Sequence, residues 1–291
     1  ILLLFLYFNK LNITFTSRCL TGTQKFINAL NKQKQGLIII RDNKNITNYN
    51  ATLLNIPIHF NKIWQEYYNT LQPYRLQADE TDAKFFLKFK DSSSDCMVVT
   101  IGVGKTVQAE LELKKKYPHC LFLAADPDSY INADLVENKL NGIFVKRGVV
   151  AEDSYTANIG ANLYGKNAGE ILFNKHFEEP PIGFFDFFVY YNGKKVIDLL
   201  ILDIEGSEFA IFALLAEQYD QLPVIICQIN VEFHHDQRLA DSFLRHRFLR
   251  NFNSFIRHGI FALMKIEMHE GLHRMFFVNY IDKICIEKFL C

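Results

Sequence analysis

The sequence lacks several signals that identify common binding proteins. Its 32 basic residues balance 32 acidic ones, so the chain has no electrostatic footprint for nucleic acid and we expect no nucleic-acid partner. Six cysteines occur without the CxxC or Cys/His spacing of zinc sites. There is no G-x-x-x-x-G-K-[ST] phosphate loop, no internal repeat and no low-complexity tract. The composition is otherwise that of an ordinary globular protein.

The cysteines are scattered rather than grouped. Cys96, Cys120 and Cys227 fall at or inside apolar runs, and we interpret them as small buried hydrophobic residues that are not paired. Cys285 and Cys291 could pair only in an oxidising compartment.

A long apolar run is also missing from the start of the chain. The opening "ILLLFLYF" has eight residues, whereas a membrane span needs about 20. Asn-x-Thr glycosylation acceptors follow at Asn12, Asn45 and Asn50. We expect a protein of the secretory pathway lumen, tethered to the membrane by an N-terminal apolar segment. The alternative is a cytoplasmic protein with chance triplets and a packed N-terminal strand.

Residues 1–95 show no regular alternation of strands and helices, and we treat them as an N-terminal extension. The spacing of apolar residues from His59 to Leu76 predicts a helix that Pro73 ends. We expect Trp64, in this helix, to be a packing anchor. The polar loop at 91–95 marks the boundary with a domain that covers residues 96–291.

Within residues 96–291 the pattern becomes regular, because apolar strands alternate with amphipathic helices. This alternation predicts a mostly parallel, doubly wound α/β sheet with helices on both faces. The predicted strands lie at 96–104, 120–128, 142–150, 196–202 and 224–234, and the predicted helices lie at 106–117, 131–140, 207–215 and 236–258.

The chain ends differently, with two strands around the turn at 269–273. Strands joined so tightly are antiparallel. A mostly parallel sheet closed by a C-terminal antiparallel hairpin points to the Rossmann-like class I methyltransferase fold.

Polar residues follow each of the five predicted parallel strands. Ligands of open parallel sheets bind beyond these carboxyl ends, so we interpret the set as a nucleoside-binding site. Each member has a structural alternative as a turn residue, a helix-terminus acid or part of a solvated loop. The set comprises Gly102 and Gly104, Asp126, Glu152 and Asp153, Asp203 and Glu205, and Glu232 and His234.

The glycine turn distinguishes between nucleoside cofactors. A dinucleotide fingerprint requires a third small residue in G-x-G-x-x-G, but Val107 occupies that position. S-adenosylmethionine has no phosphate and needs the turn, a ribose-binding carboxylate and further polar groups, which are present.

The motifs "TIGVGKT", "LFLAADPD", "LLILDIEGSEF" and "ICQINVEFH" together resemble the FkbM-type methyltransferases, and the "TIGVG" opening resembles an animal branch. The resemblance covers about residues 96–290. It implies that Gly102, Gly104 and Asp126 hold S-adenosylmethionine, and that Asp203 and Glu205 face the methyl group and the acceptor. Glu152 and Asp153 join the expected cofactor site. Thr100 departs from the family pattern, where many methyltransferases have an acid.

The expected reaction is transfer of a methyl group to a hydroxyl of a sugar, glycan or small molecule. Asp203, Glu205 or His234 could orient or deprotonate the hydroxyl. A divalent ion held by Asp203, Glu205 and Glu232 is an open alternative, although we assign no metal ligand. The rival interpretations are a methyltransferase-fold protein without catalysis and an NAD-type oxidoreductase.

Overall fold

The computed structural model describes most of the chain beyond the first 23 residues. None of the helices in this described part has both the length and the apolar character needed to cross a bilayer. The predictions for Glu152, Asp153, Glu205 and the three glycosylation acceptors fall outside the described residues. The described residues are 24–42, 60–65, 68–151, 163–164, 171–172, 179–204, 206–234, 250–257, 259–269 and 272–291.

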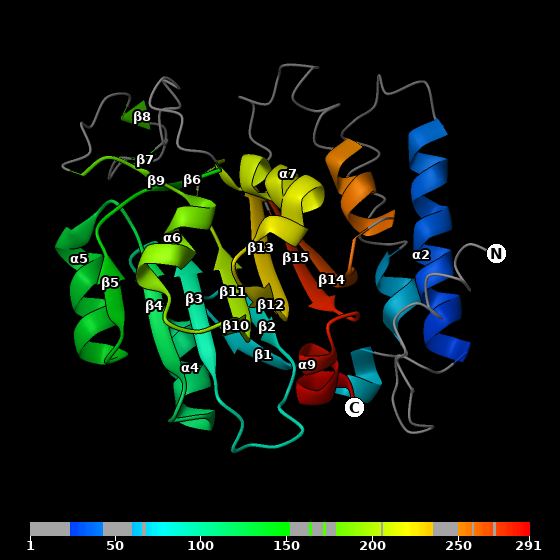
Figure 1. Ribbon diagram of the computed structural model, residues 1–291, viewed down its shortest axis with the longest axis horizontal. Helices are drawn as coiled ribbons and strands as arrows, with labels where there is room; N and C mark the ends of the chain where they lie inside the picture. Colours follow the sequence, from blue (N-terminus) through cyan, green and yellow to red (C-terminus); the bar gives the residue numbers. More distant parts are fainter. Residues whose placement is uncertain are drawn as a thin grey trace.

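A seven-stranded sheet forms the centre of the molecule (Figure 1). Its strand order is β14-β15-β13-β11-β3-β4-β5. Every neighbouring pair from β13 to β5 is parallel, and β15 runs antiparallel to both of its neighbours. The predicted parallel sheet with a terminal hairpin is confirmed. The strands are β3 (Met97–Ile101), β4 (Leu121–Ala125), β5 (Ile143–Val145), β11 (Leu199–Leu202), β13 (Gln228–His234), β14 (Phe261–His269) and β15 (Leu272–Asn279).

Apolar side chains on both faces of the sheet explain why these strands form. All residues of β3 and β11 are buried, as expected for parallel strands that are covered on both sides. One hydrophobic cluster contains the apolar faces of α6 (Phe184–Tyr191) and α7 (Glu208–Gln218). The second contains those of α4 (Gln108–Lys116) and of the helical segment 129–140.

The segment 129–140 begins after Asp128, whose side chain accepts the backbone N–H of Tyr130 at 3.1 Å. It comprises α5 (Ser129–Asp134) and a π-helical turn (Leu135–Lys139).

Two predicted strands are divided in the structure. The segment 142–150 forms β5 at the sheet edge and β6 (Val149–Val150), which pairs with β9 (Ile182–Gly183). Arg147 N–H donates to the carbonyl of Val145, and this tight turn takes the chain away from the sheet. The segment 224–234 likewise contains β12, which pairs with β10, before β13 begins. The remaining elements are β7 (Leu163–Tyr164), β8 (Ile171–Leu172), β10 (Val196–Ile197), β12 (Ile225–Ile226), a 3-10 turn (Tyr219–Gln221), α9 (Lys283–Cys285) and a π-helical turn (Ile286–Leu290).

The N-terminal region packs beside the terminal hairpin, where α2 (Gln24–Asp42) runs along the flank of the molecule (Figure 1). Trp64 is fully buried and its indole donates to Gln33 Oε1 at 2.5 Å, which confirms the packing anchor. The helical turn at 68–71 ends before Pro73, as predicted.

A small antiparallel hairpin comes next, made of β1 (Tyr74–Gln77) and β2 (Ala83–Phe86). The amide of Asn230, on β13, brackets Phe85. Its Oδ1 accepts the Phe85 N–H at 2.8 Å, and its Nδ2 donates to the Phe85 carbonyl at 2.8 Å. Gln228 Oε1 accepts the Leu87 N–H at 2.6 Å. Buried amides of the central sheet therefore fix the backbone of β2 and of Leu87 directly after it. The boundary at residue 95 stays a prediction.

The interpretation of the cysteines as unpaired is wrong. Cys96 bonds to Cys120 and Cys227 bonds to Cys285, with Cα–Cα distances of 4.5 and 5.1 Å. Cys291 is disulfide-bonded as well, so Cys285 and Cys291 do not pair with each other. Sequence spacing could not reveal the first bridge, because only the parallel pairing of β3 with β4 brings the starts of these strands together.

Candidate active site

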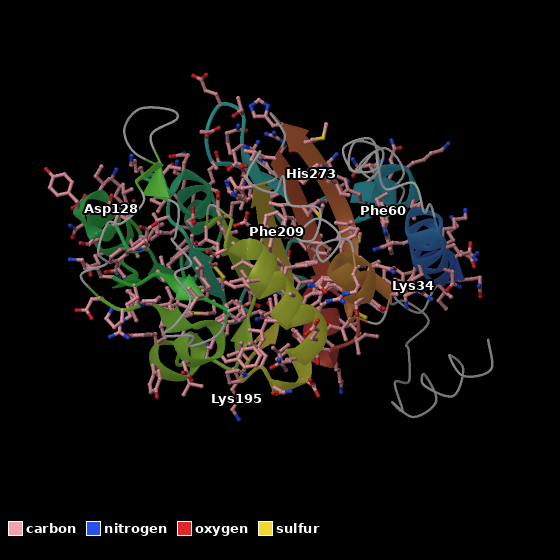
Figure 2. The ribbon with its side chains drawn as sticks, turned by 90° about the horizontal axis from the view of Figure 1, so that it is seen from above. Lys34, Phe60, Asp128, Lys195, Phe209 and His273 are labelled. Atoms are coloured by element: carbon pink, nitrogen blue, oxygen red, sulfur yellow. A yellow bond between two sulfur atoms is a disulfide. The ribbon has the colours of Figure 1, made fainter. Side chains whose placement is uncertain are left out.

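The candidate site lies at the carboxyl ends of the parallel strands. Figure 2 shows Asp128 on one flank, Phe60 and Lys34 on the other, and Phe209 of α7 between them. Phe209 directly follows Glu208, the first residue of α7, so the start of α7 lies between these two flanks. Glycine turns and acids from several strands thus meet here, as the strand-end pattern predicts.

The glycine turn after β3 touches the end of β11. Gly102 has a φ of +86°, and a Cβ there would lie 1.8 Å from the carbonyl oxygen of Asp203. Only glycine therefore fits at position 102. Gly104 also has a positive φ, of +60°, but faces open space. The predicted cofactor turn and the predicted catalytic acid are thus in direct backbone contact.

Asp126, directly after β4, organises this turn. Its Oδ2 accepts the N–H of Val103 at 2.8 Å, and its Oδ1 accepts the N–H of Asp128 at 2.7 Å. Burial raises the pKa of Asp126, although these hydrogen bonds and others from Asn132 and Gly104 oppose the shift by favouring the carboxylate. Asp126 therefore holds the glycine turn after β3, and its role in binding the ribose stays a prediction.

His234 is the best-positioned base in the described part of the site. Glu208 is fully buried, and its Oε1 accepts both the backbone N–H of His234 at 2.7 Å and the ring Nδ1 at 2.9 Å. Its Oε2 accepts the N–H of Gly206 at 2.7 Å. In the tautomer that carries its proton on Nδ1, the ring donates to Glu208 and Nε2 is the basic nitrogen.

Asp203 faces this histidine from the end of β11. Its Oδ1 lies 3.7 Å from His234 Nε2, and its Oδ2 lies 3.2 Å from the Nζ of Lys84. The side chain is 30% exposed, far more than the other acids around it. Asp203 and His234 are therefore brought together as predicted, and Asp203 is the acid that a ligand can reach.

Lys84 stands at the centre of the charged groups. Its ammonium lies 2.8 Å from Asp82 Oδ2, 3.2 Å from Asp203 and 3.3 Å from Glu232 Oε2. Desolvation by burial lowers the pKa of Lys84, but the three carboxylates outweigh it and the net shift is upward. Lys84 is therefore a positively charged ammonium group in this cluster.

Arg274, on β15, joins Glu232 to the N-terminal hairpin. Its Nε lies 2.9 Å from Glu232 Oε2 and 3.0 Å from Asp82 Oδ1. Its Nη1 donates to the carbonyl of Thr81 at 2.6 Å. These bonds fix the position of Glu232, which is buried at the rear of the cluster.

One group of residues has the composition of a metal site. Ligand atoms of Asp203, Glu232 and His234 lie within 4.8 Å of one another. Two of these residues, Asp203 and Glu232, already contact the ammonium of Lys84. The open alternative of a divalent ion thus concerns two carboxylates that already contact an ammonium group.

Thr100 replaces the acid that many methyltransferases carry on the first strand, but an acid is nevertheless adjacent. The hydroxyl of Thr100 donates to Glu110 Oε1 at 2.7 Å, and both side chains are buried. Burial raises the pKa of Glu110. A buried carboxyl group from the first turn of α4 thus lies beside Thr100.

The sequence did not reveal three residues of the charged cluster: Asp82, Lys84 and Arg274. Lys84 and Asp82 lay within the predicted N-terminal extension, and Arg274 lay in a strand treated as structural. One signal was available, because Lys84 interrupts the apolar run 83–87, where a buried cation needs a partner.

Together, the strand order and the placement of the polar residues define a Rossmann-like class I methyltransferase fold, with its candidate site at the usual edge. The methyltransferase FkbM domain family matches residues 86–256, more than half of the chain. The protein therefore belongs to the FkbM methyltransferase family. The finer resemblance to an animal branch stays a prediction.

Three of the solved structures that match the chain have low sequence identity to it. A fibrillarin/Nop5p complex shares 11% identity over 64% of this chain and 73% of its own, with a TM-score of 0.35. The plantazolicin methyltransferase BpumL, in complex with S-adenosylhomocysteine, shares 12% over 88% and 96%, with a TM-score of 0.30. The 16S rRNA (adenine(1408)-N(1))-methyltransferase from Catenulisporales acidiphilia shares 8% over 71% and 98%, with a TM-score of 0.31. No curated protein sequence matches the chain.

Proposed function

We propose that this protein is an S-adenosylmethionine-dependent O-methyltransferase that acts on a hydroxyl of a sugar, glycan or small molecule. The observation that carries the proposal is the contact between the glycine turn and Asp203, with His234 beside it. A cofactor held by the turn and a hydroxyl held by the acid and histidine would then be neighbours, as methyl transfer requires.

The cofactor site has the features that S-adenosylmethionine needs. Gly102 and Gly104 would let the backbone approach the cofactor, and Asp126 would accept hydrogen bonds from the ribose hydroxyls. When bound, the cofactor supplies a methyl group on a positively charged sulfur. Glu152 and Asp153 stay predicted contributors to this site.

His234 would act as the general base. Glu208 holds the ring through Nδ1, so Nε2 is oriented to take the hydroxyl proton as the oxygen gains its methyl group. Asp203, 3.7 Å from Nε2, would orient the hydroxyl and then stabilise the imidazolium. The proton ends on His234, and the products are a methyl ether and S-adenosylhomocysteine. Glu205 remains a predicted participant.

The two rival functions are less well supported. The departure from the family pattern at Thr100 would favour a protein without catalysis, but the carboxyl group of Glu110 lies 2.7 Å from the Thr100 hydroxyl. An NAD-type oxidoreductase would need space for a pyrophosphate near position 107, whereas Val107 is buried in the hydrophobic core.

We also propose that the protein functions in an oxidising compartment, the lumen of the secretory pathway. The Cys96–Cys120 and Cys227–Cys285 bridges support this, because structural disulfides are rare in the reducing cytosol. Treating the cell-expressed protein with an Asn-glycan-removing amidase tests the proposal. We expect a mobility shift that a triple Gln variant at Asn12, Asn45 and Asn50 abolishes. Fractionation with the cytosol and no shift would contradict it.

Transfer of a labelled methyl group tests the enzymatic function. The full chain should methylate one member of a panel of sugars, glycans and small alcohols, and His234→Asn should abolish the transfer. His119→Asn is a matched control, because His119 is exposed and its ring contacts the Ser94 carbonyl and the Tyr117 ring rather than the candidate site. Labelling of an amine or of RNA in place of a hydroxyl would overturn the proposed acceptor.

A further inference from the structure

Lys84 makes an unusual set of contacts for a lysine. Its ammonium has three N–H donors, and three carboxylates surround it at 2.8–3.3 Å. Asp82 precedes β2, Asp203 follows β11 and Glu232 belongs to β13, so one cation joins three separate elements. Lysine is rarely buried this completely, at 7% exposure, without a specific partner set.

We propose that Lys84 is a built-in cation that takes the place of a divalent metal ion in this acidic site. In this arrangement the ammonium holds Asp203 and Glu232 in position, and the site binds no metal while Lys84 is present. Lys84 is then a positioning residue that acts on the reaction through Asp203. This role rests on the proposed function, whereas the exclusion of metal does not.

The surrounding residues otherwise have the composition of a metal site. Asp203, Glu232 and His234 present oxygen and nitrogen ligands within 4.8 Å of one another. Carboxylate and imidazole ligands of this kind suit Mn²⁺, Zn²⁺ and related ions. A divalent ion bound there would lie close to the Lys84 ammonium, which contacts two of the three ligands. Repulsion between the two cations at such a distance opposes metal binding.

The summed charge of the cluster also opposes metal binding while Lys84 is present. Asp82, Asp203 and Glu232 contribute three negative charges to the cluster, and Lys84 and Arg274 contribute two positive charges. The residual charge from these groups is −1. Removing the Lys84 ammonium would leave −2, the value that a divalent cation neutralises.

The backbone that carries Lys84 is tied to the central sheet. Residue 84 belongs to β2, and the next residue, Phe85, is bracketed by both amide atoms of Asn230. Arg274 secures the same hairpin by donating to the Thr81 carbonyl and by contacting Asp82. The lysine is therefore supplied by a segment whose backbone is tied to the central sheet.

The test is Mn²⁺ binding to the full chain, measured by electron paramagnetic resonance as the loss of the free-ion signal. The wild-type protein should leave the signal unchanged. Lys84→Ala should bind one Mn²⁺, at least about tenfold more tightly than wild type, because a unit positive charge next to the site is gone. Adding Glu232→Gln to Lys84→Ala should remove this binding.

Two further variants make the result specific. Lys84→Arg keeps the charge and should bind no Mn²⁺. Lys88→Met is the matched control on the same segment, because the Lys88 ammonium lies over the Tyr74 ring rather than in the cluster, and it should behave as wild type.

Wild-type binding of Mn²⁺ that Asp203→Asn or Glu232→Gln abolishes would overturn the proposal, and this measurement does not depend on how Lys84→Ala folds. Folded Lys84→Ala that binds no Mn²⁺ would overturn it as well. Neither outcome depends on methyl transfer, so failure here is distinguishable from failure of the proposed function.

Discussion

The two edges of the central sheet are built from different chemistry. At the amino ends of the parallel strands, disulfides join Cys96 to Cys120 and Cys227 to Cys285. At the carboxyl ends there are glycine turns and a network of charged side chains around Lys84. Covalent bonds stabilise the first edge, whereas the second edge presents charged groups that a ligand could contact.

This difference indicates that stability and function are assigned to opposite edges. Disulfides limit the freedom of the unfolded chain and need no exposed polar group. A catalytic edge must present acids and bases that water would otherwise solvate, and such groups contribute little to stability or reduce it. Changes at one edge should therefore alter the melting temperature, and changes at the other should alter turnover.

The largest expected effect is on the charged edge. Asp203→Asn should reduce turnover by about 10²–10⁴-fold, because the hydroxyl loses its orienting carboxylate beside the base. The melting temperature should change little, since Asp203 is 30% exposed. Steady-state kinetics and a thermal melt measure both. Asp220→Asn is the control, because Asp220 is exposed on the turn before β12. If Asp203→Asn kept its turnover but lost much of its stability, the role of Asp203 would be structural and the account of the charged edge would be contradicted.

The opposite result is expected at the disulfide edge. Replacing Cys227 and Cys285 together by Ser opens a bridge that spans 58 residues. Loop-closure entropy then predicts a loss of about 4 kcal/mol in the free energy of unfolding. Chemical denaturation measures this loss, and turnover below the melting temperature should be unchanged. A double variant that keeps its stability but loses turnover would contradict the assignment of stability to the disulfide edge and of function to the charged edge.

A smaller effect is expected at Asp126. Asp126→Ala should weaken S-adenosylhomocysteine binding about tenfold or more, because charge-assisted hydrogen bonds of this kind contribute about 1.5–3 kcal/mol each. Calorimetry gives the affinity. Asp128→Ala is the matched neighbour, since Asp128 accepts the N–H of Tyr130 at the start of α5. Equal affinity of folded Asp126→Ala and wild type would remove Asp126 from the cofactor site.

The smallest expected effect is on the pH dependence of the protein's stability, through the carboxyl group of Glu110. Burial raises the pKa of this acid above 4.5, so its contribution to stability is fully present below pH 4.5 and is lost as the pH rises through the folded-state pKa. Glu110→Gln should therefore be more stable than wild type at neutral pH, and the difference should shrink towards pH 4.5. Melting temperatures over this range test the sign, with exposed Glu137→Gln as control. A pH-independent difference would contradict the assignment.

The fold and half of the site could be predicted because they follow from local patterns. Alternating apolar runs located β3, β4 and β11, and a parallel sheet then places Gly102, Asp126 and Asp203 at one edge. Lys84 could not be placed there, since its contacts with Asp203 and Glu232 join residues 119 and 148 positions apart in the chain.

The disulfides were missed for a related reason. A buried cysteine in an apolar run looks the same in sequence whether or not it is paired, and only the strand order brings Cys96 beside Cys120. The role of Glu208 was missed because an acid in the first turn of a helix also suits the helix dipole. Only the fold shows that its carboxylate holds His234.

Calorimetric titration of the full chain with S-adenosylhomocysteine, and separately with NAD, tests the central claim most directly. The charged edge, with its glycine turn against Asp203 and its buried Val107, predicts saturable binding of S-adenosylhomocysteine at one site per chain and no binding of NAD. A folded protein that binds NAD, or that shows no heat with S-adenosylhomocysteine at any accessible concentration, would contradict the account.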